Sequence, residues 1–172
     1  MMSRYAGRPW LKSRKALCPA YTPNSYESQP RELRLQWELL HRLNVNRTIA
    51  RKVAEGYKFV SVERKSGSGR VDVWVQSPNG MTEKIEVKGS RQVKGSHLLQ
   101  SICYHEKGDK VIVAAVDEIV EPEEWFIEPA KVMLDEIADF VERFPDEASR
   151  TYNPTPELCP SCSRTDCPHN KR

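Results

Sequence analysis

The sequence predicts an α/β fold in which a mixed sheet of four or five strands is flanked by helices. Three observations lead to this prediction. Residues 57–88 contain three short stretches of alternating apolar and polar residues, separated by tight turn signals, which indicates an antiparallel three-strand meander. Helical periodicity precedes this meander and follows it. A continuous apolar run at 110–116 then indicates a buried strand reached by a crossover connection.

The helical segments follow from apolar spacing and from the residues that end helices. Leu33, Trp37 and Leu40 recur on one face, which predicts a helix over 31–43, and a second short helix is expected over 47–55, ended by Gly56. Later in the chain, helices are expected at 97–105, with Ser96 as N-cap, and at 129–144, opened by Pro129.

The remaining segments are defined by strand and loop signals. Strands are expected at 57–63, 70–76 and 83–88, with the valines at 71, 73 and 75 on one face and Asp72 on the other. A further strand is expected at 124–128. Prolines at 9, 19, 23 and 30 predict an irregular start, and the tail from Pro145 is expected to be loop-like.

Length and charge divide the chain into three parts. With 172 residues, one main domain at 30–144 is expected, preceded by a basic, irregular arm at 1–29 that contributes Cys18 and followed by a linker and cysteine-rich tail at 145–172. Basic residues of the arm come before the first acidic residue, Glu27. They are Arg4, Arg8, Lys12, Arg14 and Lys15. Such an arm is typical of contacts with nucleic-acid phosphates, and a solvated tail is the alternative.

Several functional classes are not indicated. No apolar run reaches the ~18 residues of a membrane span, so no membrane association is expected and a cytoplasmic location is predicted. The chain has neither a Walker-type phosphate loop nor a dinucleotide glycine pattern, so no nucleotide cofactor is expected. Five cysteines in such a chain point to metal chemistry more than to disulfides.

The strands at 70–76 and 83–88 carry the residues of a hydrolytic metal site. Asp72 on one strand and Glu86 on the next could converge on one Mg²⁺ or Mn²⁺ ion, because these ions favour carboxylate oxygens. Alternation places Glu86 and Lys88 on one face, so Lys88 could orient the attacking water or hold the scissile phosphate. This set fits metal-dependent phosphodiester hydrolysis.

Asp72 and the Glu86-Val87-Lys88 triplet resemble the signature of the PD-(D/E)xK nuclease superfamily, whose restriction-endonuclease-like core has the same order of elements. Gln100 and Tyr104 are similar to the QxxxY motif of its RecB-like branch, which implies that they lie on the helix after the third strand and help to engage DNA. The branch also has an upstream acidic or histidine ligand. Glu38 is the preferred candidate for it, with His41 as the alternative.

The C-terminal cysteines indicate a second metal site. Cys159 and Cys162 have the C-x₂-C spacing that presents two thiolates to one metal, and Cys167 follows four residues later. A fourth ligand is needed for a tetrahedral site. The candidates are Cys18, His169 and Cys103, of which Cys103 is most simply a buried apolar residue within a helix.

One N-terminal cysteine with a C-terminal trio is similar to the iron–sulfur members of the RecB-like nucleases, including the CRISPR-associated and AddB types. The resemblance implies a 4Fe–4S cluster held by Cys18, Cys159, Cys162 and Cys167; Zn²⁺ is the alternative. The expected function is a metal-dependent DNA nuclease, either exo- or endonucleolytic, with DNA as partner and possible assembly with a partner protein or as a homodimer. The alternative is a non-catalytic nucleic-acid-binding protein with a zinc site on a degenerate nuclease fold.

Overall fold

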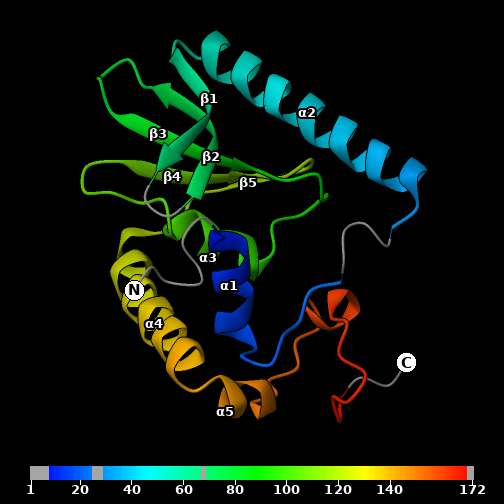
Figure 1. The fold of residues 1–172 in the computed structure, drawn as a ribbon. Coiled ribbons are helices and arrows are strands. Elements are labelled where there is room, and N and C mark those ends of the chain that lie inside the picture. Colours follow the sequence, from blue (N-terminus) through cyan, green and yellow to red (C-terminus); the bar gives the residue numbers. More distant parts are fainter. Residues whose placement is uncertain (1–7, 25–28, 67–68, 170–172) are drawn as a thin grey trace.

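The structure is a computed structural model, and it describes residues 8–24, 29–66 and 69–169 of the chain. It is an α/β fold with an open, mixed sheet of five strands flanked by helices, as predicted. Helix α2 (Arg31–Ala54) packs on one face of the sheet, and α3 (Gly95–Ile102) lies beneath the other, next to α1 (Pro9–Leu17) and α4 (Glu124–Arg143) (Figure 1). None of the described helices is long and apolar enough to cross a bilayer.

The strands lie in the sheet in sequence order. They are β1 (Lys58–Ser66), β2 (Gly69–Gln76), β3 (Thr82–Val87), β4 (Lys110–Ala114) and β5 (Ile119–Val120). The first three form the predicted antiparallel meander. Strand β4 pairs parallel to β3, which requires a crossover, and α3 is the helix of that crossover. The connection therefore brings α3 close to the C-terminal end of β3.

Alternation along β2 and β3 builds the main core. Val73, Val75, Ile85 and Val87 are at most 1% exposed and pack against apolar residues of α2. All three valines of β2 are fully buried, but they do not share one cluster: Val73 and Val75 belong to this core, whereas Val71 packs with Tyr104 and Val111. Asp72, between two of them, points to the other face and is partly accessible. The buried valines thus fix the direction in which the candidate acid points.

The start of the chain is not irregular throughout, as had been expected. Residues 9–17 form α1 because Pro9 occupies the first turn, where a helix needs no backbone N–H and the fixed φ of proline is favourable. The two helices predicted over 31–43 and 47–55 are one continuous helix, α2. Asn44 lies between them, buried, and bonds to the sheet rather than to its own backbone. The predicted apolar face of this helix is only partly buried: Trp37 remains 48% exposed.

Three predictions for the second half of the chain are also wrong. Residues 124–128 are not a strand but the first turns of α4, in which Ile127, Ala130 and Leu134 bury a face at helical spacing; the fifth strand is the short β5. The tail begins with a helix, α5 (Pro145–Arg150), again opened by proline, rather than with a loop. The helix expected over 97–105 begins two residues earlier and ends at Ile102, so Ser96 lies inside α3 and Tyr104 lies in the turn after it.

Candidate active site and cysteine-lined pocket

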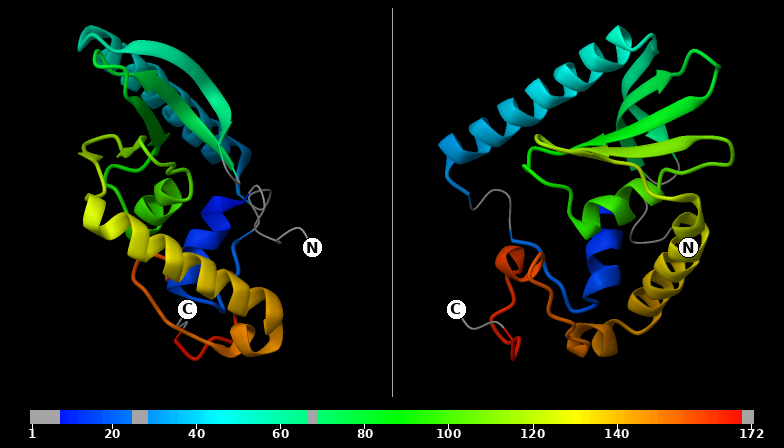
Figure 2. Two further views of the ribbon diagram at one scale, coloured as in Figure 1. Left: turned by 90° about the vertical axis from the view of Figure 1, so that its left-hand side faces the viewer. Right: turned by 180° about the vertical axis from the view of Figure 1, so that it is seen from behind.

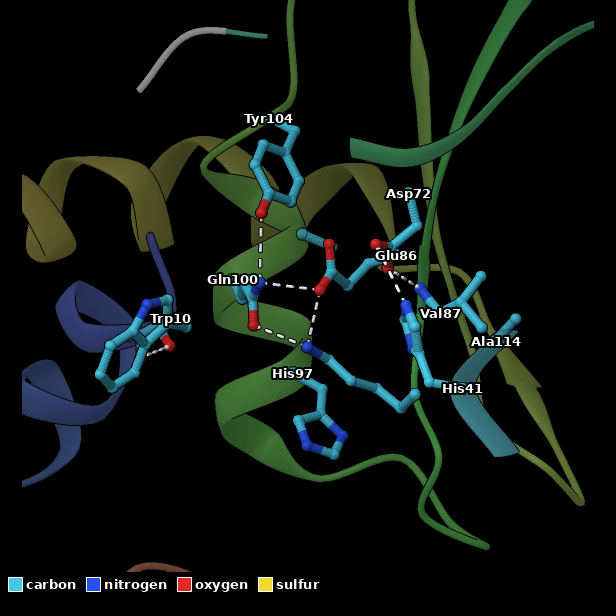
Figure 3. A network of polar contacts seen from close by, with 12 residues as sticks. Trp10, His41, Asp72, Glu86, Val87, His97, Gln100, Tyr104 and Ala114 are labelled. Carbon is cyan, nitrogen blue, oxygen red and sulfur yellow. Dashed lines mark hydrogen bonds and ion pairs between the residues drawn. The ribbon is translucent and has the colours of Figure 1, made fainter. Parts of the chain in front are cut away.

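Asp72, Glu86 and Lys88 lie together at one end of β2 and β3 (Figure 3). The backbone N–H of Val87 donates to Asp72 Oδ2 at 2.7 Å, and Lys88 Nζ donates to Glu86 Oε1 at 2.6 Å. The antiparallel register explains the first contact. It pairs Val73 with Ile85, so Asp72 lies beside Glu86 and close to Val87, the residue after it. The structure therefore brings the predicted Asp/Glu/Lys set into one cluster.

Glu86 is the most buried member of this cluster, with 4% of its surface exposed. Its Oε1 accepts from Lys88 and from Gln100, whereas its Oε2 is buried and has no hydrogen-bond partner among the described residues. Burial raises the pKa of Glu86 to about 7; the positive charge of Lys88 opposes this rise and the negative charge of Asp72 adds to it. An unpartnered, desolvated carboxylate oxygen beside a second carboxylate is suited to a cation.

Gln100 of the crossover helix α3 connects this helix to the end of β3. Its Oε1 accepts from Lys88 Nζ at 2.8 Å, and its Nε2 donates to Glu86 Oε1 at 2.7 Å and to the Tyr104 hydroxyl at 3.1 Å. Tyr104 is 3% exposed; burial, and then the charge of Glu86, raise its pKa above the ordinary range, so the phenol stays neutral. Although Tyr104 follows the helix instead of lying on it, its hydroxyl still meets Gln100.

On the open side of the cluster, His41 of α2 faces Asp72. Its Nε2 lies 3.6 Å from Asp72 Oδ1, and this contact, partly offset by burial, raises the pKa of His41. Glu38 lies three residues earlier and lines the same pocket of about 340 Å³, together with His41 and Asp72. Of the two candidates for the upstream ligand, His41 therefore makes the direct contact with Asp72, whereas Glu38 lies on the wall of the pocket beside it.

Two residues of the site were not predicted from the sequence. The buried amide of Asn44 donates to the carbonyl oxygens of Lys88 at 2.9 Å and Ala114 at 3.3 Å, so it fixes the end of β3. His97 Nδ1 accepts from the backbone N–H of Lys94 at 3.1 Å, and burial, followed by the charge of Lys88, lowers the pKa of His97 to about 3. A polar residue within an apolar helical stripe was the available signal for Asn44; no comparable pattern pointed to His97.

The four cysteines expected to share a metal line one pocket. It is bordered by Cys18, Cys159, Cys162 and Cys167, together with Tyr21 and Leu158. Two segments that are far apart in the sequence meet here (Figure 2), since Asn24 N donates to Ser161 O at 3.2 Å and Ser163 N donates to Thr22 O at 2.8 Å. His169 is not among the residues that line this pocket.

Cys103 lies apart from the other cysteines, as expected from its position. It is the C-cap residue of α3, its Sγ donates to Leu99 O at 3.4 Å, and burial raises its pKa to about 11. A buried thiol of this kind is a packing residue rather than a thiolate ligand.

The donor sets of the two sites fit the metals predicted for them. Cysteine sulfurs are soft ligands suited to iron–sulfur clusters or zinc, and the carboxylates of Asp72 and Glu86 suit Mg²⁺ or Mn²⁺. In residues 8–24, 29–66 and 69–169, no group of three His, Cys, Asp or Glu side chains is already drawn together closely enough to hold an ion.

The basic arm makes contacts within its own chain. Lys12 forms an ion pair with Asp135, Arg14 donates to the Tyr21 hydroxyl at 3.1 Å, and Lys15 donates to Pro19 O at 3.1 Å. Arg8 is exposed, and Arg4 lies outside the described residues. Three of the five basic side chains therefore hold α1 and its following loop in place, and their contact with nucleic acid stays a prediction.

Comparisons with protein-family profiles, with curated proteins and with solved structures found no match to this chain.

Proposed function

We propose that this chain is a metal-dependent nuclease that hydrolyses phosphodiester bonds in DNA, and that its sheet and α3 are a restriction-endonuclease-like core. The observation that carries the proposal is the environment of Glu86. One of its oxygens is held by Lys88 and Gln100, while the other is buried and has no hydrogen-bond partner in the described part of the chain, and the negative charge of Asp72 acts on the same carboxyl group. A divalent cation would satisfy that oxygen and neutralise the repulsion between the two carboxylates.

Each residue of the cluster then has a chemical role. Asp72 and Glu86 would hold Mg²⁺ or Mn²⁺, with His41, or Glu38 beside it, as a third ligand, and the ion would supply Lewis acidity and an activated water. Lys88, whose Nζ is fixed by Glu86 and Gln100, orients that water or holds the scissile phosphate. Tyr104 keeps the Gln100 amide in the orientation that this requires.

We further propose that the cysteine-lined pocket holds a 4Fe–4S cluster, with Zn²⁺ as the alternative. The support is that Cys18 from one end of the chain and the trio from the other line the same pocket. His169 as a replacement ligand fits only the zinc alternative. Anaerobically purified protein should be brown if iron and sulfur are bound, whereas a colourless protein with stoichiometric zinc would decide for zinc.

The proposed partner is DNA, read through its phosphates by the basic residues near the start of the chain, and the proposed location is the cytoplasm, where free cysteines and bound metals are common. We also propose that the chain assembles with a partner protein or with a second copy, because its sequence has no Walker-type phosphate loop with which it could drive DNA movement itself.

The test is cleavage of labelled single- and double-stranded DNA with Mg²⁺ or Mn²⁺. Wild type should cut, whereas Asp72→Ala and Lys88→Ala should not, because each removes a group that acts on the reacting phosphate. Lys65→Ala, which removes an exposed lysine of β1, is the matched control and should cut like wild type. DNA binding without cleavage by any of these proteins would instead favour the non-catalytic binding function.

A further inference from the structure

The N-terminus of α3 is held by a side chain from the distant C-terminal tail. Glu157 Oε2 accepts from the backbone N–H of Gly95 at 2.9 Å, and Glu157 Oε1 accepts from the backbone N–H of Ser96 at 2.9 Å. These are N–H groups of the first turn, which have no partner within a helix. A carboxylate bonded to both of them also interacts favourably with the positive end of the helix dipole.

The carboxylate lies close to the backbone at position 95. A Cβ atom added to Gly95 would lie 3.4 Å from Glu157 Oε2, at the lower limit of ordinary van der Waals contact. Glycine therefore leaves the carboxylate room to reach the backbone. Because α3 has only eight residues, its own hydrogen bonds fix it weakly, and outside contacts decide where it lies.

The other end of α3 carries the side chain that organises the active site. Gln100 lies within the helix, five residues after Gly95, and its amide bridges Glu86 and Lys88. A short helix moves as a rigid unit, so a shift or rotation at Gly95 is passed on to Gln100. The hydrogen bonds of the Gln100 amide with Glu86 (2.7 Å) and Lys88 (2.8 Å) weaken when the helix is displaced.

Glu157 is itself firmly held by its neighbours in the tail. It is followed by Leu158, which is 3% exposed, and a turn encloses it, since Leu158 N donates to Thr155 Oγ1 and Cys159 N donates to Thr155 O, both at 3.1 Å. The same turn carries Cys159 into the cysteine-lined pocket. The hydrogen bonds of this turn thus fix the backbone from which the Glu157 carboxylate reaches α3.

We propose that Glu157 is a positioning residue of the active site: its carboxylate sets the position of α3 so that the Gln100 amide lies between Glu86 and Lys88. The inference rests on the proposed nuclease function, because the network that it positions is the one assigned there to catalysis. It adds to that function a residue of the tail, which touches neither the reacting phosphate nor the other catalytic side chains.

The test compares Glu157→Gln and Glu157→Asp with wild type in the full chain. Glutamine keeps the length of the side chain but turns one acceptor into a donor, which faces a backbone N–H. We expect kcat for DNA cleavage with Mg²⁺ to fall about tenfold while KM for DNA is unchanged, because chemistry rather than binding is misaligned. Aspartate keeps both acceptors and the charge and should recover part of the loss. Glu136→Gln, an exposed residue of α4, is the charge-matched control.

Backbone hydrogen exchange supplies a second readout that needs no activity. In Glu157→Gln, amides of residues 95–102 should exchange faster, whereas those of β2 and β3 should not change, because the main core is untouched. Equal kcat in wild type and Glu157→Gln would overturn the inference. Faster amide exchange throughout the chain in both variants would also overturn it, because Glu157 would then stabilise the whole fold rather than the position of α3.

The two proposals fail in different ways. If wild type does not cut DNA, the nuclease proposal fails and the exchange measurement still decides whether Glu157 positions α3. If wild type cuts and the Glu157 variants cut equally well, the nuclease proposal stands and the positioning role is wrong.

Discussion

Replacing Glu86 with glutamine should raise the free energy of unfolding at alkaline pH and should also abolish the proposed DNA cleavage. The side chain keeps its shape, and its amide oxygen can still accept from Lys88 and Gln100. What disappears is a negative charge that is buried beside Asp72 with one oxygen unpartnered. Such a charge costs folding free energy until a cation binds to it.

The size of the effect follows from proton linkage. The pKa of Glu86 in the folded chain is about 7, above its ordinary value of 4.5, so between these values the folded chain holds a proton that the unfolded chain has lost. Stability of the wild type therefore falls as pH rises through this window. Relative to Glu86→Gln, the loss between about pH 5 and about pH 8 should be on the order of 2–3 kcal/mol.

The assay is urea unfolding at both pH values in the presence of a chelator, with the free energy of unfolding taken from each curve. The difference between the free energies of unfolding at the two pH values is compared between the proteins. Effects of the substitution on packing that do not depend on pH cancel in this difference. Mg²⁺ or Mn²⁺ at alkaline pH should then stabilise wild type but not the variant. Glu83→Gln is the matched control: it breaks the ion pair of another buried β3 carboxylate with Lys52 and should simply destabilise.

Two results would refute this reasoning. An identical pH dependence in wild type and Glu86→Gln would mean that the buried carboxylate does not titrate near neutrality. Equal stabilisation of both proteins by the metal would mean that the cation binds elsewhere.

Three further predictions address the surrounding residues. Mn²⁺ affinity, measured by calorimetry, should fall about tenfold or more in His41→Gln and much less in Glu38→Gln, because His41 Nε2 lies 3.6 Å from Asp72 Oδ1; the reverse order would assign the upstream ligand to the glutamate. Cys18→Ser should lower the metal content and the free energy of unfolding, whereas Cys103→Ser should retain the metal; equal retention would remove the N-terminal thiol from the site. Lys84→Met should destabilise the chain by about 1–3 kcal/mol in urea unfolding, because it removes a buried ammonium group that donates to Tyr104 O and pairs with the more accessible carboxylates of Glu106 and Asp109; no loss would show that packing replaces the charge.

The part of the site that lies on the sheet was predictable because strands repeat every two residues. Once the valines of β2 are assigned to the core, alternation predicts that Asp72 points away from it. On β3, the same alternation predicts that Glu86 points away from the core formed by Ile85 and Val87. Gln100 was assigned to the site because Gln100 and Tyr104 resemble the QxxxY motif, and the structure places Gln100 on the crossover helix with its amide bonded to Glu86. Local pattern thus predicted the three-strand meander, the crossover strand and the position of the acids on the strands.

What the sequence did not reveal depends on contacts between distant segments. Asn44 looked like a gap between two helices, and only its bonds to Lys88 O and Ala114 O show why the helix continues. Residues 124–128 have the composition of a strand, but packing against Ile102 makes them helical. Glu157 is one acidic residue among many in the sequence, and no local pattern could assign it to a helix 61 residues away.

The meeting of Cys18 with the three cysteines of the tail at one pocket has a consequence for biosynthesis. Cys18 leaves the ribosome well before Cys167, by roughly 10–30 s at ordinary rates of synthesis. During that interval its thiol has none of the later cysteines beside it and is open to oxidants. Any metal that the four cysteines share can be bound by all of them only once Cys167 has emerged, whereas Asp72, Glu86 and Lys88 emerge earlier and can fold first.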